Sequence, residues 1–410
     1  SDVCSSDLFM KVLFVNTTGG YFGGVEQNIA LTAAGLRARG HTPYFFCEQA
    51  TGRDWEGYSG IFERAFSGEE GTLQELAPAL ELDSVYVHKL AAIQPVLDLA
   101  GAGARRDGAT RGLHLVRMVH DHDLYCPRLH KYYFHNRKIC TKPAGPHCWL
   151  DLAFLKKDAK ASCAWGKLRG LGYRSIGAHI REMKKNHALD TLIVGSSYMR
   201  EQLITNGFQP SQIHVNPPVL PRDDTQAKPL PREMRVLYTG QLIRGKGVDL
   251  LLDAVSRLRV PFHLDVVGAG NDESFLKERA AELGVGGRTT FHGWIPHQRL
   301  AGLYDGARCV VVPSRWPEPF GMVGLEAMQR ARPVVAFASG GIPDWLDHGV
   351  TGFLVPTGDV SGLAEKIEMV LRDGELAAQL GAAGKKRVEE RFSFENYLDE
   401  LERLLSPPAP

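Results

Sequence analysis

The sequence lacks any long apolar run. No stretch of roughly 18 apolar residues, the length that a membrane-spanning helix needs, occurs among the 410 residues. The signature of a secretory signal peptide, a basic start followed by an apolar stretch and a small-residue cleavage site, is also missing. Residues 1–9 show no pattern that leads into the chain, so they are left out of the fold prediction. We therefore expect a soluble, cytoplasmic protein.

An excess of charge of one sign is missing as well. Lys and Arg together number 48 and Asp and Glu 47, which gives a formal net charge of +1 at pH 7. This balance provides no general attraction to nucleic acid, and we predict no nucleic-acid partner. The basic stretch 156–185 is a local exception that could lie on anionic lipid at the cytoplasmic membrane face or hold an acidic acceptor. A solvated basic helix is the more common explanation for such a stretch.

Cysteine is sparse, with seven residues. In a long chain without a secretory signal, an odd number of cysteines indicates thiols or metal ligands rather than a disulfide framework. The segment 120–165 contains four of the cysteines, Cys126, Cys140, Cys148 and Cys163, and among its histidines His130, His135 and His147 lie between or beside them. No pair has the Cys-x2-Cys spacing of common zinc sites, so ordinary thiols are the favoured interpretation. A structural zinc bound by the four cysteines is the alternative.

The length of the chain exceeds the size at which one hydrophobic core keeps growing. Short apolar strands alternate with helical patterns over residues 10–216 and again over residues 234–385, which predicts two doubly wound α/β domains. Residues 217–233 are rich in proline and poor in apolar side chains, as is typical of a linker. Residues 386–410 are predicted to form a C-terminal helix that packs back toward the first domain. Two such domains imply a ligand site between them.

One strand, loop and helix of the second domain carries two glutamates. Residues 309–312 are predicted to form a buried parallel strand, the prolines around Glu318 exclude a helix there, and Glu326 lies in the helix that follows. This unit would lie at the carboxyl edge of a parallel sheet, where α/β folds bind ligands. An anion would suit the N–H groups at the start of the helix, those of Gly321, Met322 and Val323. Carboxylates nearby would suit hydroxyl groups, so the pattern predicts a nucleotide sugar as ligand. The alternative is that Glu318 is a solvated loop residue and Glu326 an exposed helix position.

Several motifs occur in order between Lys11 and Asp359. They are "GGVE", "YTGQLIRGKGVDLLLDA", "VVGAG", "FHGWIP", "VVVPS" followed by "EPFGMVGLEAM", and "GGIPDWLDHGVTGFLVPTGD". Together they resemble the GT-B glycosyltransferases of family 4, the retaining part of glycosyl transferases group 1 that includes the sucrose and glycogen synthases. The resemblance implies an α/β fold of two Rossmann-like domains that face a central cleft, the first on the acceptor side and the second binding a nucleotide-sugar donor.

The resemblance also implies roles for the two glutamates. Glu318 and the backbone N–H groups that follow it, beginning at Phe320, would hold the donor sugar and its phosphate. Glu326 would bind the ribose hydroxyls.

The diphosphate of the donor would be bound by the loop that opens the second domain. Lys246 matches the family's lysine, whereas Gln241 stands where family members commonly have an arginine, which removes one positive charge. Arg244 could compensate from the same loop, or could be a solvated loop cation.

Two features of the first domain complete the expected site. Backbone at Gly23 and Gly24 could touch a phosphate, because glycine allows close approach. His120 corresponds to a histidine that the family often places near the transferred sugar. It could donate a hydrogen bond to a sugar hydroxyl or stabilise charge as the bond to phosphate breaks. A packed structural histidine is the alternative.

The stretch Asp121-His122-Asp123 has a pattern that holds a divalent metal in the other large glycosyltransferase fold. The GT-B group needs no such metal, because cations and helix N-termini neutralise the diphosphate. We therefore assign no catalytic metal and expect no cofactor.

The sequence accordingly predicts transfer of a hexose from a UDP-, GDP- or ADP-sugar to a hydroxyl acceptor, with retention of configuration. The acceptor would be a glycan, a lipid-linked molecule or a small molecule. No carboxylate nucleophile is assignable, so the resemblance suggests front-face transfer, with His120, Lys246 and Glu318 as the residues next to the reacting atoms. A GT-B nucleotide-sugar epimerase and a non-catalytic sugar-nucleotide-binding protein are the alternatives.

Overall fold

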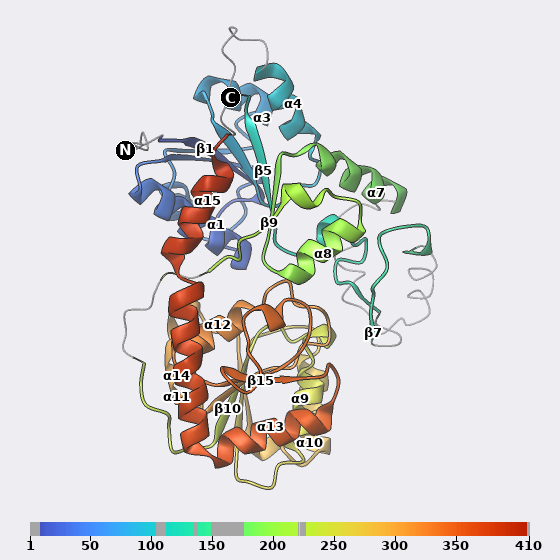
Figure 1. Ribbon diagram of the computed structural model, residues 1–410, viewed down its shortest axis with the longest axis vertical. Helices are drawn as coiled ribbons and strands as arrows, with labels where there is room; N and C mark the ends of the chain where they lie inside the picture. Colours follow the sequence, from blue (N-terminus) through green and yellow to red (C-terminus); the bar gives the residue numbers. More distant parts are fainter. Residues whose placement is uncertain are drawn as a thin grey trace, which may run out of the picture.

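The computed structural model describes residues 9–103, 112–133, 138–148, 176–219, 221 and 227–407. It consists of two α/β units, one above the other in Figure 1, each built around a parallel sheet. The predicted fold class is therefore confirmed. Within the described residues, none of the helices combines the length and the apolar character that a membrane span requires.

The first sheet has seven strands in the order β3-β2-β1-β4-β5-β8-β9. Their central residues are buried on both faces, as expected for β-branched and aromatic runs in a parallel sheet covered by helices. The strands are β1 (Lys11–Thr18), β2 (Thr42–Gln49), β3 (Arg64–Ser67), β4 (Ser84–Val87), β5 (His114–Val119), β8 (Thr191–Val194) and β9 (Ile213–Val215). The helices are α1 (Gly24–Ala38), α2 (Trp55–Ser59), α3 (Leu73–Leu76), α4 (Gln94–Gly103), α7 (Ile176–Lys185) and α8 (Ser197–Thr205). A separate antiparallel pair is formed by β6 (Tyr132–Tyr133) and β7 (Lys138–Ile139).

The second sheet has six strands in the order β12-β11-β10-β13-β14-β15. They are β10 (Arg235–Thr239), β11 (His263–Val267), β12 (Thr289–Gly293), β13 (Cys309–Val312), β14 (Val334–Phe337) and β15 (Gly352–Val355). The helices are α9 (Val248–Val255), α10 (Glu273–Glu282), α11 (His297–Gly306), α12 (Met322–Gln329), α13 (Val360–Arg372) and α14 (Gly374–Arg391).

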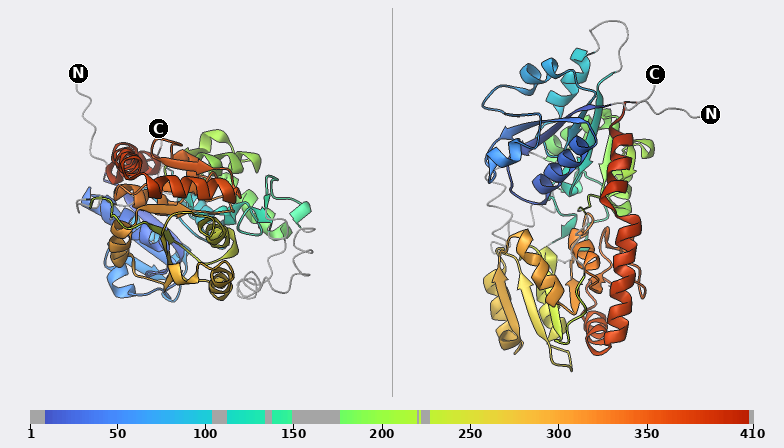
Figure 2. Two further views of the ribbon diagram at one scale, coloured as in Figure 1. Left: turned by 90° about the horizontal axis from the view of Figure 1, so that it is seen from below. Right: turned by 90° about the vertical axis from the view of Figure 1, so that its left-hand side faces the viewer.

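The chain ends with a helix that returns to the first domain. The predicted boundary between residues 385 and 386 is displaced, because it falls inside α14. The break comes at Phe392, after which the Ser393 hydroxyl accepts the N–H of Asn396 and begins α15 (Phe394–Leu405). Figure 2 shows α14 beside the second domain and α15 beside the first. The hydroxyl groups of Tyr397 on α15 and Thr32 on α1 lie 3.0 Å apart and tie the two helices together.

The carboxyl edges of the two sheets face each other. His122 follows β5, and its Nε2 lies 2.8 Å from the carbonyl oxygen of Pro317, which follows β13. The guanidinium of Arg53, which follows β2, lies 5.1 Å from the ring centroid of Trp294, which follows β12. A ligand bound between the two edges could therefore contact residues of both sheets. The carboxyl ends of the strands are also where open α/β sheets bind their ligands.

Candidate functional site

A buried ion pair lies at the carboxyl edge of the second sheet. The Nζ of Lys246, at the end of the turn η5 (Arg244–Lys246), is 2.7 and 2.9 Å from the two carboxylate oxygens of Glu318. The hydroxyl of Ser314 and the indole N–H of Trp316 also donate to this carboxylate. Burial alone would raise the pKa of Glu318, but the Lys246 ammonium and these hydrogen bonds lower the pKa overall. Glu318 is only 5% exposed, so the alternative of a solvated loop residue is wrong.

Two glycines allow the loops around this pair to touch. Gly247 has φ 72°, and a Cβ there would lie 1.9 Å from the carbonyl oxygen of Pro313. Gly268 has φ 135°, and a Cβ there would lie 1.8 Å from the carbonyl oxygen of Gly240. Both positions therefore require glycine, for space as well as for backbone conformation. The loops that follow β10, β11 and β13 converge as a result.

A second buried ion pair fixes the loop that carries Lys246. The guanidinium of Arg315 makes two hydrogen bonds of 2.7 Å to the carboxylate of Asp249 on α9. Its backbone N–H donates to the carbonyl of Gly245 at 2.9 Å, and its Nη1 lies 3.4 Å from the carbonyl of Arg244. Arg315 is 4% exposed. This pair, which the sequence analysis did not identify, holds the η5 turn against the loop that carries Glu318.

Glu326 is held by a tyrosine from a different helix. It lies on α12, half-buried, and the hydroxyl of Tyr304 on α11 donates to its Oε2 at 2.6 Å. The same hydroxyl lies 3.1 Å from the Thr239 hydroxyl at the end of β10. Burial raises the pKa of Tyr304 well above its ordinary value, and the charge of Glu326 adds to this effect. Glu326 is therefore an oriented carboxylate rather than an exposed helix position.

The start of α12 is set by the buried Trp345. Its indole N–H donates to the carbonyl of Phe320 at 2.6 Å. A Cβ at Gly324 would lie 1.9 Å from the ring of Trp345. Only glycine at this position therefore lets the first turn of α12 pack against the tryptophan. Three residues at this helix start, Gly321, Met322 and Val323, are predicted to direct their N–H groups at an anion. All three are partly exposed. The first N–H groups of a helix have no intrahelical partner, which suits this role.

The two candidate residues near Lys246 have different surroundings. Gln241 is exposed in the loop after β10. Arg244 contacts two residues of the second domain. Its Nε lies 3.2 Å from a carboxylate oxygen of Asp272, and its guanidinium lies 4.2 Å from the ring centroid of Phe275. Arg244 therefore already has an acidic partner in Asp272 through its Nε.

The glycine-rich loop of the first domain is open at its tip. A Cβ at Gly24 would meet no atom within 4 Å among the described residues. The N–H of Gly23 already donates to the buried carboxylate of Glu26 at 2.9 Å. That carboxylate also accepts from Asn16 and Thr18, at 3.1 and 3.0 Å. Glu26, which closes the "GGVE" motif, therefore shapes this loop, a role that the motif alone does not reveal.

His120 lies directly after β5 and is half-buried. Its Nε2 is 2.8 Å from the Nδ1 of His88, which follows β4. Burial lowers the pKa of His120 to about 3, and the nearby charges of Lys89 and Arg117 contribute to the decrease. The ring is therefore neutral at pH 7. It can donate a hydrogen bond, but it carries no positive charge.

The Asp121-His122-Asp123 stretch is occupied by protein contacts. Lys89 Nζ lies 2.7 Å from an oxygen of Asp121 and 4.0 Å from one of Asp123. The ring of His122 contacts the hydroxyl of Tyr125 on one side and the carbonyl of Pro317 on the other. All three side chains thus have protein partners, and the absence of a catalytic metal here stays a prediction.

Acid is expected to destabilise the fold through His120 and His88. Burial holds the pKa of both below the ordinary value of 6.5, so below pH 6.5 the unfolded chain takes up protons that the folded chain does not. Stability should fall as the pH decreases from 6.5 toward 3, by at most about 1.4 kcal/mol per pH unit for each histidine. Urea unfolding of the protein and of His120→Asn between pH 7 and pH 5 measures this effect. Equal slopes for both proteins would contradict it.

The cysteine segment does not gather a metal site within the described residues. Cys126, Cys140 and Cys148 are buried free thiols, and no group of three His, Cys, Asp or Glu side chains in the described ranges could hold a metal ion. These three cysteines therefore do not by themselves form the zinc site that was the alternative to ordinary thiols. Cys163 and His135 lie outside the described residues, as does most of the basic stretch 156–185.

Metal analysis is expected to find less than one zinc per chain in protein purified without a histidine tag. The reason is that the described thiols are packed without a shared metal geometry. A circular dichroism spectrum that stays unchanged in a chelator such as EDTA would agree. One tightly bound zinc per chain, with loss of folding in chelator, would restore the zinc hypothesis.

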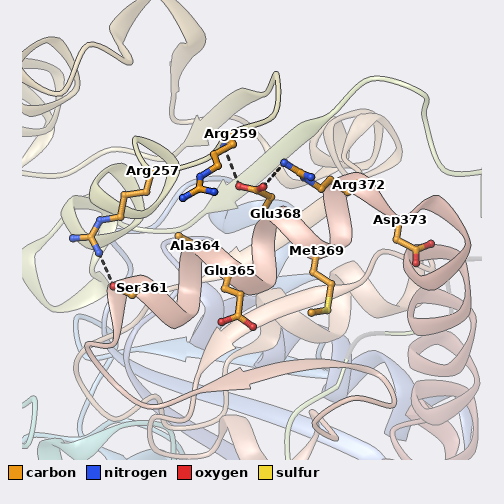
Figure 3. Close-up of a pocket in the computed structure, with 9 residues that line it drawn as sticks. All are labelled: Arg257, Arg259, Ser361, Ala364, Glu365, Glu368, Met369, Arg372 and Asp373. Atoms are coloured by element: carbon orange, nitrogen blue, oxygen red, sulfur yellow. Dashed lines mark hydrogen bonds and ion pairs between the residues drawn. The ribbon is translucent and has the colours of Figure 1, made fainter.

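A surface pocket of the second domain lies apart from these residues (Figure 3). It is lined mainly by α13, together with Arg257 and Arg259. Two of its three guanidinium groups are already engaged with the protein, since Arg257 donates to the Ser361 hydroxyl at 2.8 Å and Arg372 pairs with Glu368 at 2.7 Å. It contains none of the residues predicted to bind a ligand.

Comparisons with known proteins bear on both the sequence and the fold. The family model described as glycosyl transferases group 1 matches residues 222–387. A D-inositol 3-phosphate glycosyltransferase of Catenulispora acidiphila is 33% identical over 245 residues, which cover 53% of this chain and 57% of the relative. The lipopolysaccharide core biosynthesis glycosyltransferase LpsE of Rhizobium meliloti is 34% identical over 172 residues, which cover 42% of this chain and 49% of the relative. The chain thus spans about half the length of the curated relatives it matches.

Solved structures match along the whole chain. HepE of Anabaena, solved with UDP and glucose, has a TM-score of 0.70 at 20% identity, with 97% of this chain and 99% of HepE covered. Sucrose-phosphate synthase of Thermosynechococcus elongatus has a TM-score of 0.67 at 21% identity, with 96% and 98% covered. At this level of identity the likeness shows the fold, which is GT-B. Residues 222–387 are thus similar to the glycosyl transferases group 1 family, and the chain as a whole has the two-domain GT-B fold.

Proposed function

We propose that this protein transfers a hexose from a nucleoside diphosphate sugar to a hydroxyl acceptor, with retention of configuration. The observation that carries the proposal is the Lys246–Glu318 pair, which lies beside the N-terminus of α12 at the edge that faces the first domain. A cation and a helix N-terminus suit a diphosphate, and two oriented carboxylates suit sugar hydroxyls. The names of the relatives, which are glycosyltransferases, and the UDP bound to HepE support this reading.

In the proposed complex the second domain holds the donor. Lys246 and the N–H groups of residues 321–323 would bind the diphosphate, and Glu318 would accept hydrogen bonds from the sugar. Glu326, oriented by Tyr304, would bind the ribose. Gln241 and Arg244 would flank the diphosphate, and the open backbone at Gly23 and Gly24 would approach it from the first domain.

The chemistry that we propose is front-face transfer. The leaving phosphate oxygen takes the proton of the acceptor hydroxyl while the new glycosidic bond forms on the face from which the phosphate departs. The protein contributes positioning and charge stabilisation rather than a nucleophile. Lys246 and the helix N-terminus balance the charge that develops on the phosphate, so the proposed reaction uses no metal or other cofactor. His120 contributes a neutral hydrogen-bond donor from the first domain.

The acceptor that we propose is a glycan, a lipid-linked molecule or a small molecule bound on the side of the first domain, in the cytoplasm or at the cytoplasmic face of a membrane. An epimerase and a non-catalytic binding protein are the rival functions. An epimerase would isomerise the donor without any acceptor, and a binding protein would leave it unchanged.

Replacing Glu326 by Ala is expected to weaken the binding of UDP-glucose or UDP by about 10- to 100-fold, because a hydrogen bond to a charged group contributes roughly 1.5 to 3 kcal/mol. Isothermal titration calorimetry measures the change. Tyr304→Phe keeps the carboxylate but removes the hydroxyl that orients it, so its effect should be smaller. Glu390→Ala on α14 serves as the control, because this exposed glutamate pairs with the exposed Lys386. Unchanged affinity for every donor that binds the unaltered protein would remove Glu326 from the site.

A further inference from the structure

Two histidines from adjacent strands form a hydrogen-bonded pair beside the proposed site. β4 and β5 are neighbours in the parallel first sheet, and each is followed directly by a histidine, His88 or His120. The Nδ1 of His88 lies 2.8 Å from the Nε2 of His120, and the ring centroids are 5.1 Å apart. The atoms that face each other are therefore defined for both rings.

We propose that His88 is a positioning residue that fixes the tautomer of His120. In this arrangement the Nδ1–H of His88 donates to the Nε2 of His120. His120 then carries its own proton on Nδ1, the atom on the other side of the ring, and offers it to a ligand. The role in catalysis rests on the proposed function, whereas the tautomer does not.

The pair permits only two arrangements of its protons when both rings are neutral. Either His88 donates from Nδ1, or His120 donates from Nε2. In the second arrangement His88 must carry its proton on Nε2. The environment of that atom decides between the two.

His88 is locked in an apolar environment and is 1% exposed. Its ring stacks on Phe14 with centroids 5.7 Å apart and an interplanar angle of 10°, and it lies 4.4 Å from the ring centroid of Tyr86. Its Nε2 is buried and has no hydrogen-bond partner among the described residues. A proton on Nε2 would be a buried donor without an acceptor, and orphaned buried N–H groups are rarer than under-satisfied acceptors. The proton of His88 therefore belongs on Nδ1.

The Nδ1 side of His120 is more open than the environment of His88. It is only half-buried, and within the described part of the chain its Nδ1 makes no hydrogen bond. The charged groups near the ring are Lys89, Asp121 and Arg117, and burial together with the two cations keeps the ring neutral. A neutral His120 that accepts from His88 has one N–H, on Nδ1, and no hydrogen bond to another described residue occupies it. It matches a sugar hydroxyl or a phosphate oxygen, both of which accept hydrogen bonds.

The tautomer can be read directly by long-range 15N–1H NMR of protein labelled with 15N-histidine. The His120→Gln variant assigns the signals of His120. In the unaltered protein, without any ligand, we expect a protonated Nδ1 and an unprotonated Nε2 for His120. A protonated Nε2 on His120 would overturn the proposal. Because the tautomer is measured on the unaltered protein, this test does not depend on the stability of a variant.

Two variants at position 88 test whether His88 is the cause. His88→Leu removes the hydrogen-bond donor and puts an apolar side chain in its place. It should shift His120 toward the Nε2–H tautomer. His88→Asn places an amide N–H close to where Nδ1 lies, and it should preserve the Nδ1–H tautomer. An unchanged tautomer in folded His88→Leu would show that another group sets it.

Kinetics separate the tautomer from the proposed function. If both hold, His88→Leu should lower kcat by about 10-fold with little change in donor affinity, and His88→Asn should restore most of the loss. If the protein transfers no sugar, the unaltered protein has no rate with which the variants can be compared. The NMR measurement still tests the tautomer in that case. Equal kcat values for His88→Leu and the unaltered protein would remove the positioning role.

Discussion

Replacing Lys246 by Met is expected to lower turnover by about 100-fold, with a smaller effect on donor affinity. Methionine keeps most of the apolar stem of lysine and deletes the charge. Lys246 contacts both oxygens of Glu318, and in the proposed complex it binds the donor diphosphate. Positive groups placed where charge develops typically contribute 10²- to 10³-fold to turnover. Only interactions that are stronger in the transition state speed the step, and this is why turnover should fall more than affinity.

The Lys246→Met test needs two controls. Lys277→Met, on α10, removes an exposed lysine that pairs with Glu273 and lies 5.7 Å from the ring centroid of Phe291, and it should leave turnover unchanged. Adding an arginine in Gln241→Arg should restore part of the rate of Lys246→Met, because it supplies the charge that family members commonly have there. If Lys246→Met kept turnover within a factor of a few, Arg244 would become the better candidate. The diphosphate assignment would then have to move.

Replacing Arg315 by Met is expected to lower the free energy of unfolding by about 3 to 5 kcal/mol. The change leaves the carboxylate of Asp249 buried without its cation, and breaking one side of a buried pair typically has a cost of this size. Urea denaturation measures the loss. Replacing both partners, in Arg315→Met with Asp249→Leu, should recover much of it, since an apolar pair of similar volume leaves no buried charge.

The same pair is expected to affect donor binding because it holds the turn that carries Lys246. Donor affinity should fall in Arg315→Met and stay low in the double variant, even where stability recovers, because the contact with the carbonyl of Arg244 is lost in both. Arg403→Met removes an arginine from an exposed pair with Glu400 and should change stability by less than about 1 kcal/mol. A change of the same small size in Arg315→Met would show that the buried pair does not stabilise the loop.

Local sequence patterns were sufficient to predict most of the fold. The β-branched run at residues 309–312 is β13, and prolines next to Glu318 do place it in a loop before the helix that carries Glu326. The edge strands β3 and β9 show no continuous apolar run, because β3 begins with Arg64 and ends with Ser67, and β9 has only three residues with His214 at its centre. The break between α14 and α15 was displaced because helix-forming residues continue up to Arg391, and the cap at Ser393 decides the end.

The contacts that orient the site residues could not be predicted in this way. Tyr304 lies 22 positions from Glu326, Arg315 lies 66 from Asp249, and His88 lies 32 from His120. Each pair joins elements that become neighbours only through the order of strands in a sheet or through the packing of a helix on it. Sequence spacing contains no information about that order, so it identifies the carboxylates but not the groups that hold them.

The most direct measurement of the central claim is a screen of UDP-, GDP- and ADP-hexoses with the purified protein, with and without hydroxyl acceptors, read by NMR. We expect one donor to be hydrolysed slowly by water when no acceptor is present, and a new glycosidic bond of the same anomeric configuration when a suitable acceptor is added. We expect neither product from Lys246→Met at a comparable rate. Isomerised donor without acceptor would contradict the account in favour of an epimerase, and binding of a donor without any turnover in the whole screen would contradict it in favour of a binding protein.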